Sequence, residues 1–404
     1  MVVSDLFHPG IWSCLPVSGG SLCDCDRVWA EYNEDGKIIY RALPKKRDII
    51  FPKYDGLFFD LVLGNPYLKH FQDFKEETPN LKWLNRKAYT LDLAILEASD
   101  LASWNNQVKF IQDNLTEEVI KKAFKALPED TKTEEDSIVI SKLLKRKENL
   151  EEFAEQYHNV LSKIVILKGT NNQDDILVTR KPKGITNVKI FSGDERELVL
   201  DRDFDKKETK EIRIYGLNDC DSFRVEGKGN KNILVRLIGG IDNDTYDIKS
   251  SKKIKVYDYK NGNSVENSSF LASRRFIDDY EINTYDYKTP KYDLFTMQPN
   301  FGYNPDDGIK VGVAEIVTLN GFESKPFSQK HYLNADYFFA TKGFDFTYKG
   351  SFMRALGKWN VDLNARYTSP TFSINFFGLG NNTINEEDKY GMARRCKGFR
   401  YYKR

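Results

Sequence analysis

The sequence predicts a mixed fold: a helical middle region, a β-rich region with β-roll-like Asn/Asp-Gly turns, and the first antiparallel strands of an incomplete transmembrane β-barrel. Three observations predict it. Apolar residues recur at helical spacing across 91–163, three similar turns follow in 164–258, and apolar and polar residues alternate across much of 291–377. We expect domain boundaries that give 1–60, 61–163, 164–258, 259–290 and 291–404.

Composition excludes some classes of protein. The chain has 404 residues, with 61 Lys+Arg against 60 Asp+Glu, so its charge does not favour a nucleic-acid partner. No apolar run reaches the length of a transmembrane helix. The N-terminus lacks the features of a signal peptide, because Pro9, Gly10 and Pro16 interrupt any apolar stretch.

The first two regions are predicted from turn and cap signals. Asp35-Gly36 between two β-prone runs predicts a hairpin within 1–60, which we interpret as an irregular remnant of an upstream domain. In 61–163, Ser99 and Thr116 are suited to cap helices. A further one or two helices are expected after Ile138, with a core face of Leu143, Leu150, Phe153, Tyr157 and Leu161.

The region 164–258 contains three similar turns that begin at Gly169, Gly216 and Gly239. In each turn an apolar residue and Gly precede an Asn/Asp-rich stretch that ends in Asp and another apolar residue. The third turn nearly fits a calcium β-roll repeat, which makes Asp221, Asp242 and Asp244 candidate Ca²⁺ ligands. The alternative is a stack of β-turns closed by Asx hydrogen bonds, with no metal.

Residues 259–290 are polar and are predicted to be a linker. Four strands are expected after them, because apolar and polar residues alternate at 309–313, 333–339, 344–352 and 358–367, with aromatic side chains near the ends. This pattern is typical of transmembrane β-strands, although a soluble sandwich also alternates. The side chains expected to face the membrane are Phe344, Phe346, Tyr348, Trp359, Val361, Leu363 and Tyr367.

Several short motifs together resemble a known family. They include Phe51-Pro52-Lys53-Tyr54-Asp55-Gly56 and Asn304-Pro305-Asp306-Asp307-Gly308, with others at 69–72, 80–83, 85–92, 208–217, 239–245 and 375–381. In this order they resemble the C-terminal region of large metallophosphoesterase-related proteins of Gram-negative bacteria. Those proteins end in an outer-membrane β-barrel of the bacterial surface antigen type.

The resemblance implies a location in the cell outer membrane, with outer-membrane lipid and the barrel-assembly machinery as partners. The family's phosphoesterase metal motifs do not occur here. A stretch before the Phe51 turn resembles the end of a kinase-like phosphotransfer fold, in which Asp48 would be a metal ligand. Ile50 stands at the second acidic position, so no complete catalytic site is expected.

Three functional hypotheses follow. The chain is a fragment of an outer-membrane β-barrel protein that serves as an anchoring and periplasmic module, an expectation that its patternless ends support. Alternatively, it is a remnant of a metal-dependent phosphoesterase or phosphotransferase that uses Asp48. The third hypothesis is a soluble β-rich protein that binds Ca²⁺ or a glycan through its Asp/Asn turns.

Overall fold

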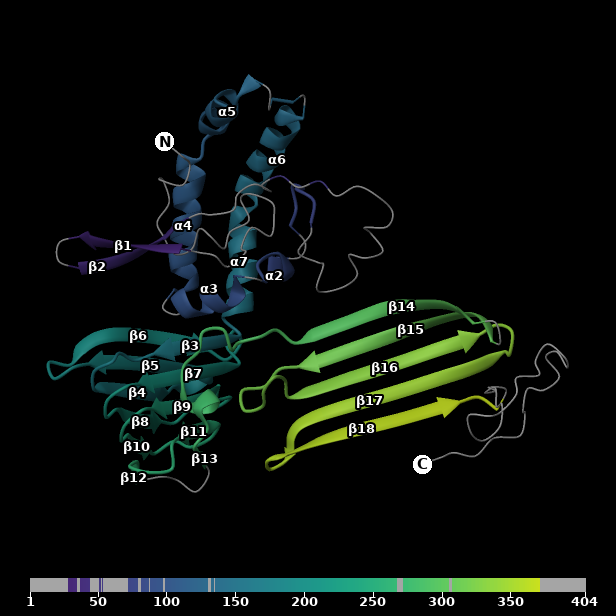
Figure 1. Ribbon diagram of the computed structural model, residues 1–404. Coiled ribbons are helices and arrows are strands. Elements are labelled where there is room, and N and C mark those ends of the chain that lie inside the picture. Colours follow the sequence, from purple (N-terminus) through teal and green to yellow (C-terminus); the bar gives the residue numbers. More distant parts are fainter. Residues whose placement is uncertain are drawn as a thin grey trace. The chain divides into compact units, whose positions relative to one another are not determined.

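Figure 1 shows the computed structural model of the chain. It describes residues 28–34, 37–43, 51, 53, 72–78, 81–86, 88–96, 99–129, 132–133, 135–266, 272–304 and 307–370. Asp48 lies outside the described residues, as do both patternless ends of the chain.

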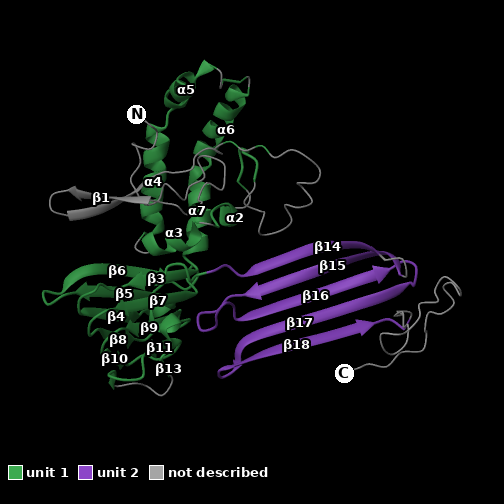
Figure 2. Cartoon of the chain, viewed as in Figure 1, with its two compact units in different colours: residues 1–59, 69–290 green, residues 60–68, 291–404 purple. Residues whose placement is uncertain are grey.

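The fold is mixed and consists mostly of strands, with one antiparallel sheet of five strands. The chain divides into two units, 1–59 with 69–290 and 60–68 with 291–404 (Figure 2). We call them unit 1 and unit 2. The division after Pro290 falls where the barrel strands were predicted to begin.

The N-terminal hairpin was predicted correctly. Strand β1 (Val28–Glu34) pairs antiparallel with β2 (Lys37–Leu43), and Glu34 lies opposite Lys37 at the turn. Asp-Gly is a residue pair that two-residue hairpin connections favour, which is why the sequence signal was informative.

The helices of unit 1 are α2 (Leu81–Leu84), α3 (Tyr89–Ile95), α4 (Leu101–Asn114), α5 (Glu117–Lys125), α6 (Asp136–Glu148) and α7 (Leu150–Leu161). Thr116 caps α5 as predicted, but Asp100 rather than Ser99 caps α4, because its carboxylate accepts from the Ser103 N–H at 2.8 Å. All five predicted core residues after Ile138 are buried. None of the described helices is long and apolar enough to cross a membrane.

Two facing sheets form the rest of unit 1. The first has the order β12-β10-β8-β4-β5-β6 and the second the order β13-β11-β9-β7-β3. Apolar side chains from both sheets, such as Val178, Phe223, Ile214 and Leu237, form one core. The strands are β3 (Ile164–Lys168), β4 (Asp174–Arg180), β5 (Ile185–Ser192), β6 (Glu197–Asp205), β7 (Glu211–Leu217), β8 (Ser222–Gly227), β9 (Leu234–Gly240), β10 (Thr245–Ile248), β11 (Ile254–Asp258), β12 (Ser264–Glu266) and β13 (Ser273–Phe276).

Residues 259–290 are not the linker that the sequence predicts. They contribute β12, β13 and the short helix α8 (Tyr280–Asn283), and β12 and β13 pair with the two sheets. The ring of Tyr285 also packs edge-on against Tyr215, with 5.2 Å between centroids. Strand β12 has three residues and β13 has four, and strands this short cannot be recognised from an alternation pattern.

Unit 2 is an antiparallel meander of five strands in the order β14-β15-β16-β17-β18 (Figure 1). The strands are β14 (Leu294–Asn304), β15 (Gly308–Leu319), β16 (Gln329–Phe338), β17 (Gly343–Leu356) and β18 (Trp359–Thr368). Four of them were predicted from alternation, and β14 was missed. Among the described strands β14 and β18 are the edges of this sheet, and no closed barrel is formed.

Candidate functional site

Antiparallel pairing determines which side chains share a face of the unit 2 sheet. Phe301 lies opposite Val311, Val311 opposite Tyr337, and Tyr337 opposite Phe344. Side chains alternate between faces along each strand, so these pairs define one face of the whole sheet, here called the apolar face. Its polar members are Glu315, Gln329 and His331. Its other large members are Phe295, Met297, Phe301, Tyr303, Ile309, Val311, Val313, Val317, Leu333, Tyr337, Phe344, Phe346, Tyr348, Phe352, Trp359, Val361, Leu363 and Tyr367.

The apolar face is exposed. The relative exposed area is 72% for Phe301, 74% for Tyr303 and 77% for Trp359. All seven side chains that the sequence predicted to face a membrane lie on it. A contiguous exposed apolar surface of this kind marks a membrane or protein contact rather than a water-facing surface.

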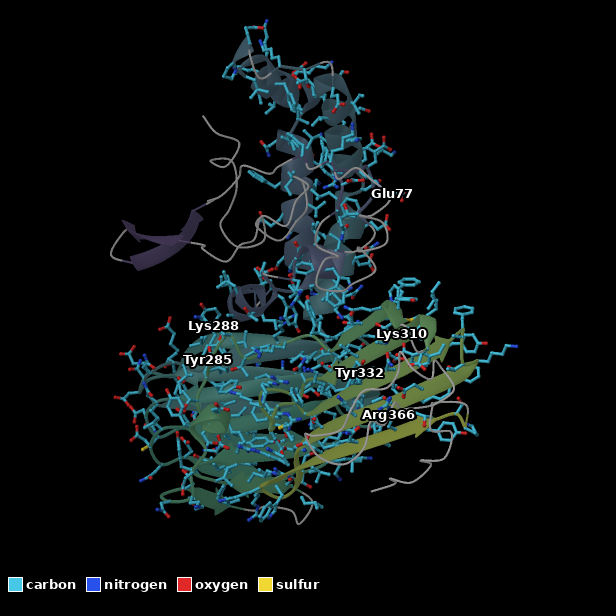
Figure 3. All side chains as sticks on the ribbon, turned by 45° about the vertical axis from the view of Figure 1, so that its right-hand side comes forward. Glu77, Tyr285, Lys288, Lys310, Tyr332 and Arg366 are labelled. Carbon is cyan, nitrogen blue, oxygen red and sulfur yellow. The ribbon has the colours of Figure 1, made fainter. Side chains whose placement is uncertain are left out.

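The opposite face, here called the polar face, contains a network of charges. Lys310 Nζ lies 3.0 Å from Asp336 Oδ2, and Arg366 Nη2 lies 2.6 Å from Asp345 Oδ2. Asp336 and Asp345 are only 5% and 8% exposed. Lys310 and Arg366, labelled in Figure 3, belong to this face together with Tyr332. The two carboxylates of the polar face are therefore buried and ion-paired, while aromatic rings on the apolar face are exposed.

Aromatic side chains gather at both ends of the apolar face. Tyr303, Tyr337, Phe344 and Tyr367 lie at one end, which we call the Tyr303 rim. Phe295, Phe352 and Trp359 lie at the other end, which we call the Trp359 rim. Strands of about 9–11 tilted residues between two aromatic girdles span an apolar band of about 25 Å. The five strands of the unit 2 sheet have 10 to 14 residues.

The three similar turns of unit 1 stack on one another. Asp175, Ser222, Thr245 and Ser264 lie side by side in neighbouring parallel strands. The residues before them are Asp174, Asp221, Asp244 and Asn263, which therefore form a column that we call the carboxylate ladder.

Each step of the carboxylate ladder is a hydrogen bond from backbone to side chain. The Asp174 N–H donates to Asp221 Oδ1 at 2.9 Å, and the Asp221 N–H donates to Asp244 Oδ1 at 2.9 Å. The Asp244 N–H donates to Asn263 Oδ1 at 2.8 Å. The recurring Asp is thus explained by stacking, since each carboxyl satisfies a buried N–H of the adjacent turn.

The recurring Gly has a steric cause. A Cβ on Gly216 would overlap Asp221 Oδ2, and a Cβ on Gly239 would overlap Asp244 Oδ2. The carboxyl of each turn therefore occupies the space that a side chain at the glycine would need. At the last turn Asp258 takes the position of this glycine, which is why the sequence showed only three turns.

The carboxyls of the ladder are not arranged around a common point. Among the described residues, no three His, Cys, Asp or Glu side chains are grouped so as to hold a metal ion. Asp242 lies in the exposed part of its turn and accepts from the Asp219 N–H at 3.2 Å. Asp221 and Asp244 instead point at neighbouring turns, so the structure does not bring the three predicted calcium ligands together.

Burial changes the chemistry of the ladder. Asp221 and Asp244 are 2% and 1% exposed. Among the described residues Asp221 Oδ2 has no hydrogen-bond partner, whereas the carboxyl of Asp244 shares a hydrogen bond with that of Asp258. Loss of hydration raises the pKa of Asp221 to about 8 and that of Asp244 to about 9. Burial also raises the pKa of Asp258, which accepts from the Tyr246 hydroxyl at 2.6 Å. Asp221 and Asp244 are therefore protonated at neutral pH, and a Ca²⁺ ion would have to displace both protons in order to bind them.

A small cavity in unit 1 is too small for a substrate. It encloses about 20 Å³, which holds about one water molecule, and Asp92, Trp104, His158 and Arg202 help to line it. Burial lowers the pKa of His158 to about 4, so its imidazole is neutral at pH 7. The cavity therefore gives no support to an enzymatic site.

No protein-family model matches the chain, and no match was found among curated proteins or solved structures. The resemblance to metallophosphoesterase-related proteins therefore remains a prediction.

Proposed function

We propose that unit 2 is part of the wall of an outer-membrane β-barrel. The apolar face then contacts the lipid tails, and the polar face lines a hydrated interior. One observation carries this proposal: apolar side chains are exposed and charged side chains are buried, the reverse of a water-facing sheet. Trp359 is 77% exposed, while Asp336 is 5% exposed. In water such a face loses the stabilisation of about 25 cal/mol per Å² that burial of apolar surface provides, and in lipid it regains it.

In this proposal unit 1 acts as a β-roll-like periplasmic module, and outer-membrane lipid and the barrel-assembly machinery are the partners. Unit 1 suits such a role because its stacked strands hold one continuous core. Its described residues offer no catalytic site, and Asp48 lies outside them. The anchoring role is therefore favoured over a phosphoesterase remnant.

Neighbouring residues on one strand give a sharp test. Leu363 lies on the apolar face opposite Gly350, and Asn364 lies on the polar face opposite Lys349. Leu363→Arg should weaken membrane insertion by about 2–4 kcal/mol if the residue lies near the bilayer midplane. Asn364→Arg adds the same charge and meets Lys349, a cross-strand repulsion of about 0.2–1 kcal/mol.

The measurement is flotation of the full chain with phosphatidylcholine vesicles after dilution from urea. We expect the original chain and the Asn364→Arg variant to float with the vesicles, and the Leu363→Arg variant to remain at the bottom of the gradient. A protein that stays monodisperse without detergent and never floats would support the soluble Ca²⁺- or glycan-binding alternative and reject the barrel. Equal flotation of the two variants would also contradict the assignment of faces.

A further inference from the structure

The two rims of the unit 2 sheet differ in charge. The Tyr303 rim combines Lys310, Lys342 and Arg366 with Asp307, Asp336 and Asp345, and two of its cations are paired across strands. The Trp359 rim combines Lys291, Lys325, Lys330, Arg354 and Lys358 with Asp293, Glu323 and Asp362. Among the described residues, the Trp359 rim is therefore basic and the Tyr303 rim is balanced.

The β17–β18 hairpin presents this charge beside apolar side chains. Leu356 pairs with Trp359 at its tip, and the two are 69% and 77% exposed. Arg354 and Lys358 are also exposed and flank them. Apolar side chains that enter the interface beside cations that remain at headgroup level are the usual arrangement at a membrane surface.

Local geometry holds the hairpin in this form. The pairing register shifts between Phe352 and Leu356, so Arg354 leaves the regular ladder of the strand pair with a φ of +53°. Its backbone N–H donates to Asn360 Oδ1 at 2.9 Å. Gly357, with a φ of +66°, makes the turn. Arg354 and Lys358 therefore belong to a hairpin whose backbone is held by hydrogen bonds.

One of these cations, Lys358, is exposed and has no ion-pair partner in the part of the chain that the structure describes. An anionic layer just beyond the apolar band would supply the missing counter-charge.

We infer that the Trp359 rim binds the phosphate headgroups of an anionic phospholipid layer, through the β17–β18 hairpin. This inference rests on the proposed function, because it requires the apolar face to be in the bilayer. It adds an orientation, since the basic rim lies in the leaflet that is richer in anionic lipid. A cation near such a surface contributes about 1 kcal/mol, which is screened within about 8–10 Å at physiological salt.

The test compares vesicles of phosphatidylcholine with vesicles that also contain phosphatidylglycerol. The full chain should partition more strongly into the anionic vesicles at low salt, and this preference should shrink at high salt. Lys358→Gln should lower partitioning into anionic vesicles about fivefold, and Arg354→Gln with Lys358→Gln should lower it ~25-fold. Neither variant should change partitioning into phosphatidylcholine.

Lys342→Gln is the matched control, because Lys342 occupies a hairpin tip at the other rim. It should retain the full preference for anionic vesicles. If Lys342→Gln reduces the preference as much as Lys358→Gln does, or if the original chain shows no preference, the inference is wrong while the barrel proposal stands. Failure to float with either vesicle would reject the barrel proposal and this inference with it.

Discussion

Asparagine in place of Asp221 should stabilise unit 1 at neutral and alkaline pH. The carboxyl has a pKa of about 8 in the fold and 3.8 as its ordinary value, so folding takes up a proton between these pH values. Stability from this group is fully present below about pH 4 and is lost as pH rises through about 8. The amide of the Asp221→Asn variant would bind no proton in either state, so this slope should disappear.

The size of the effect follows from linkage. One carboxyl contributes a slope of at most about 1.4 kcal/mol per pH unit between the two pKa values, which sums to an upper bound of about 4 kcal/mol at pH 7. The buried amide of the variant needs hydrogen-bond partners of its own. Incomplete pairing of this amide reduces the gain by about 1–3 kcal/mol. A net gain of about 1–3 kcal/mol at pH 7 is expected. Asn263 shows that the ladder accepts an amide, because its Nδ2 donates to the Tyr259 carbonyl at 2.9 Å.

The assay is urea unfolding of the full chain in detergent across about pH 5 to pH 8, read by pulse hydrogen exchange of peptides that contain the ladder. Asp242→Asn is the control, since Asp242 lies in the exposed part of the same turn and Asn tolerates its φ of +79°. The control should keep the original pH slope, and Asp221→Asn should flatten it. An unchanged slope in Asp221→Asn would show that this carboxyl is already ionised in the fold and would refute the reasoning.

Two further substitutions test the packing of unit 1 by urea unfolding of the full chain. Gly239→Ala should cost about 1–3 kcal/mol, because its Cβ would overlap Asp244 Oδ2, and an unchanged midpoint would contradict the stacking of the turns. Glu211→Gln should cost about 2–4 kcal/mol, since Glu211 Oε1 accepts from Arg213 Nε at 2.6 Å and Arg236 Nε at 2.9 Å in a largely buried cluster. The exposed pair of Glu117 and Lys121 provides the control, where Glu117→Gln should cost under about 0.5 kcal/mol.

Local signals in the sequence predicted the elements that a single segment specifies. The apolar periodicity after Ile138 gave the core faces of α6 and α7, and Thr116 gave the start of α5. The strict alternation of apolar and polar residues predicted which face of the sheet each residue of β18 lies on. β14 was missed because Pro299 and Gly302 interrupt its alternation with residues that are rare inside strands.

The ladder could not be predicted in full because its partners are distant in the chain. Asp174 and Asp221 are 47 residues apart, whereas Asp221 and Asp244 are 23 residues apart. The longer separation includes β5, which pairs with β4, and β6, which pairs with β5 and extends the sheet. A repeat with such uneven spacing shows which residue types recur, but not that a carboxyl of one turn accepts from the backbone of the previous one.

The two units neutralise their buried acids in different ways. On the polar face of unit 2, Asp336 and Asp345 each have a cation within 3.0 Å. In the ladder, Asp221 is surrounded by Asp174, Asp219 and Asp258, so a proton is the counter-charge that the fold itself provides. Unit 1 should therefore respond to pH, while the ion pairs on the polar face of unit 2 should respond to salt, which screens them. An Asp-rich repeat is thus compatible with a metal-free core whenever each carboxyl can keep its proton and accept a backbone N–H.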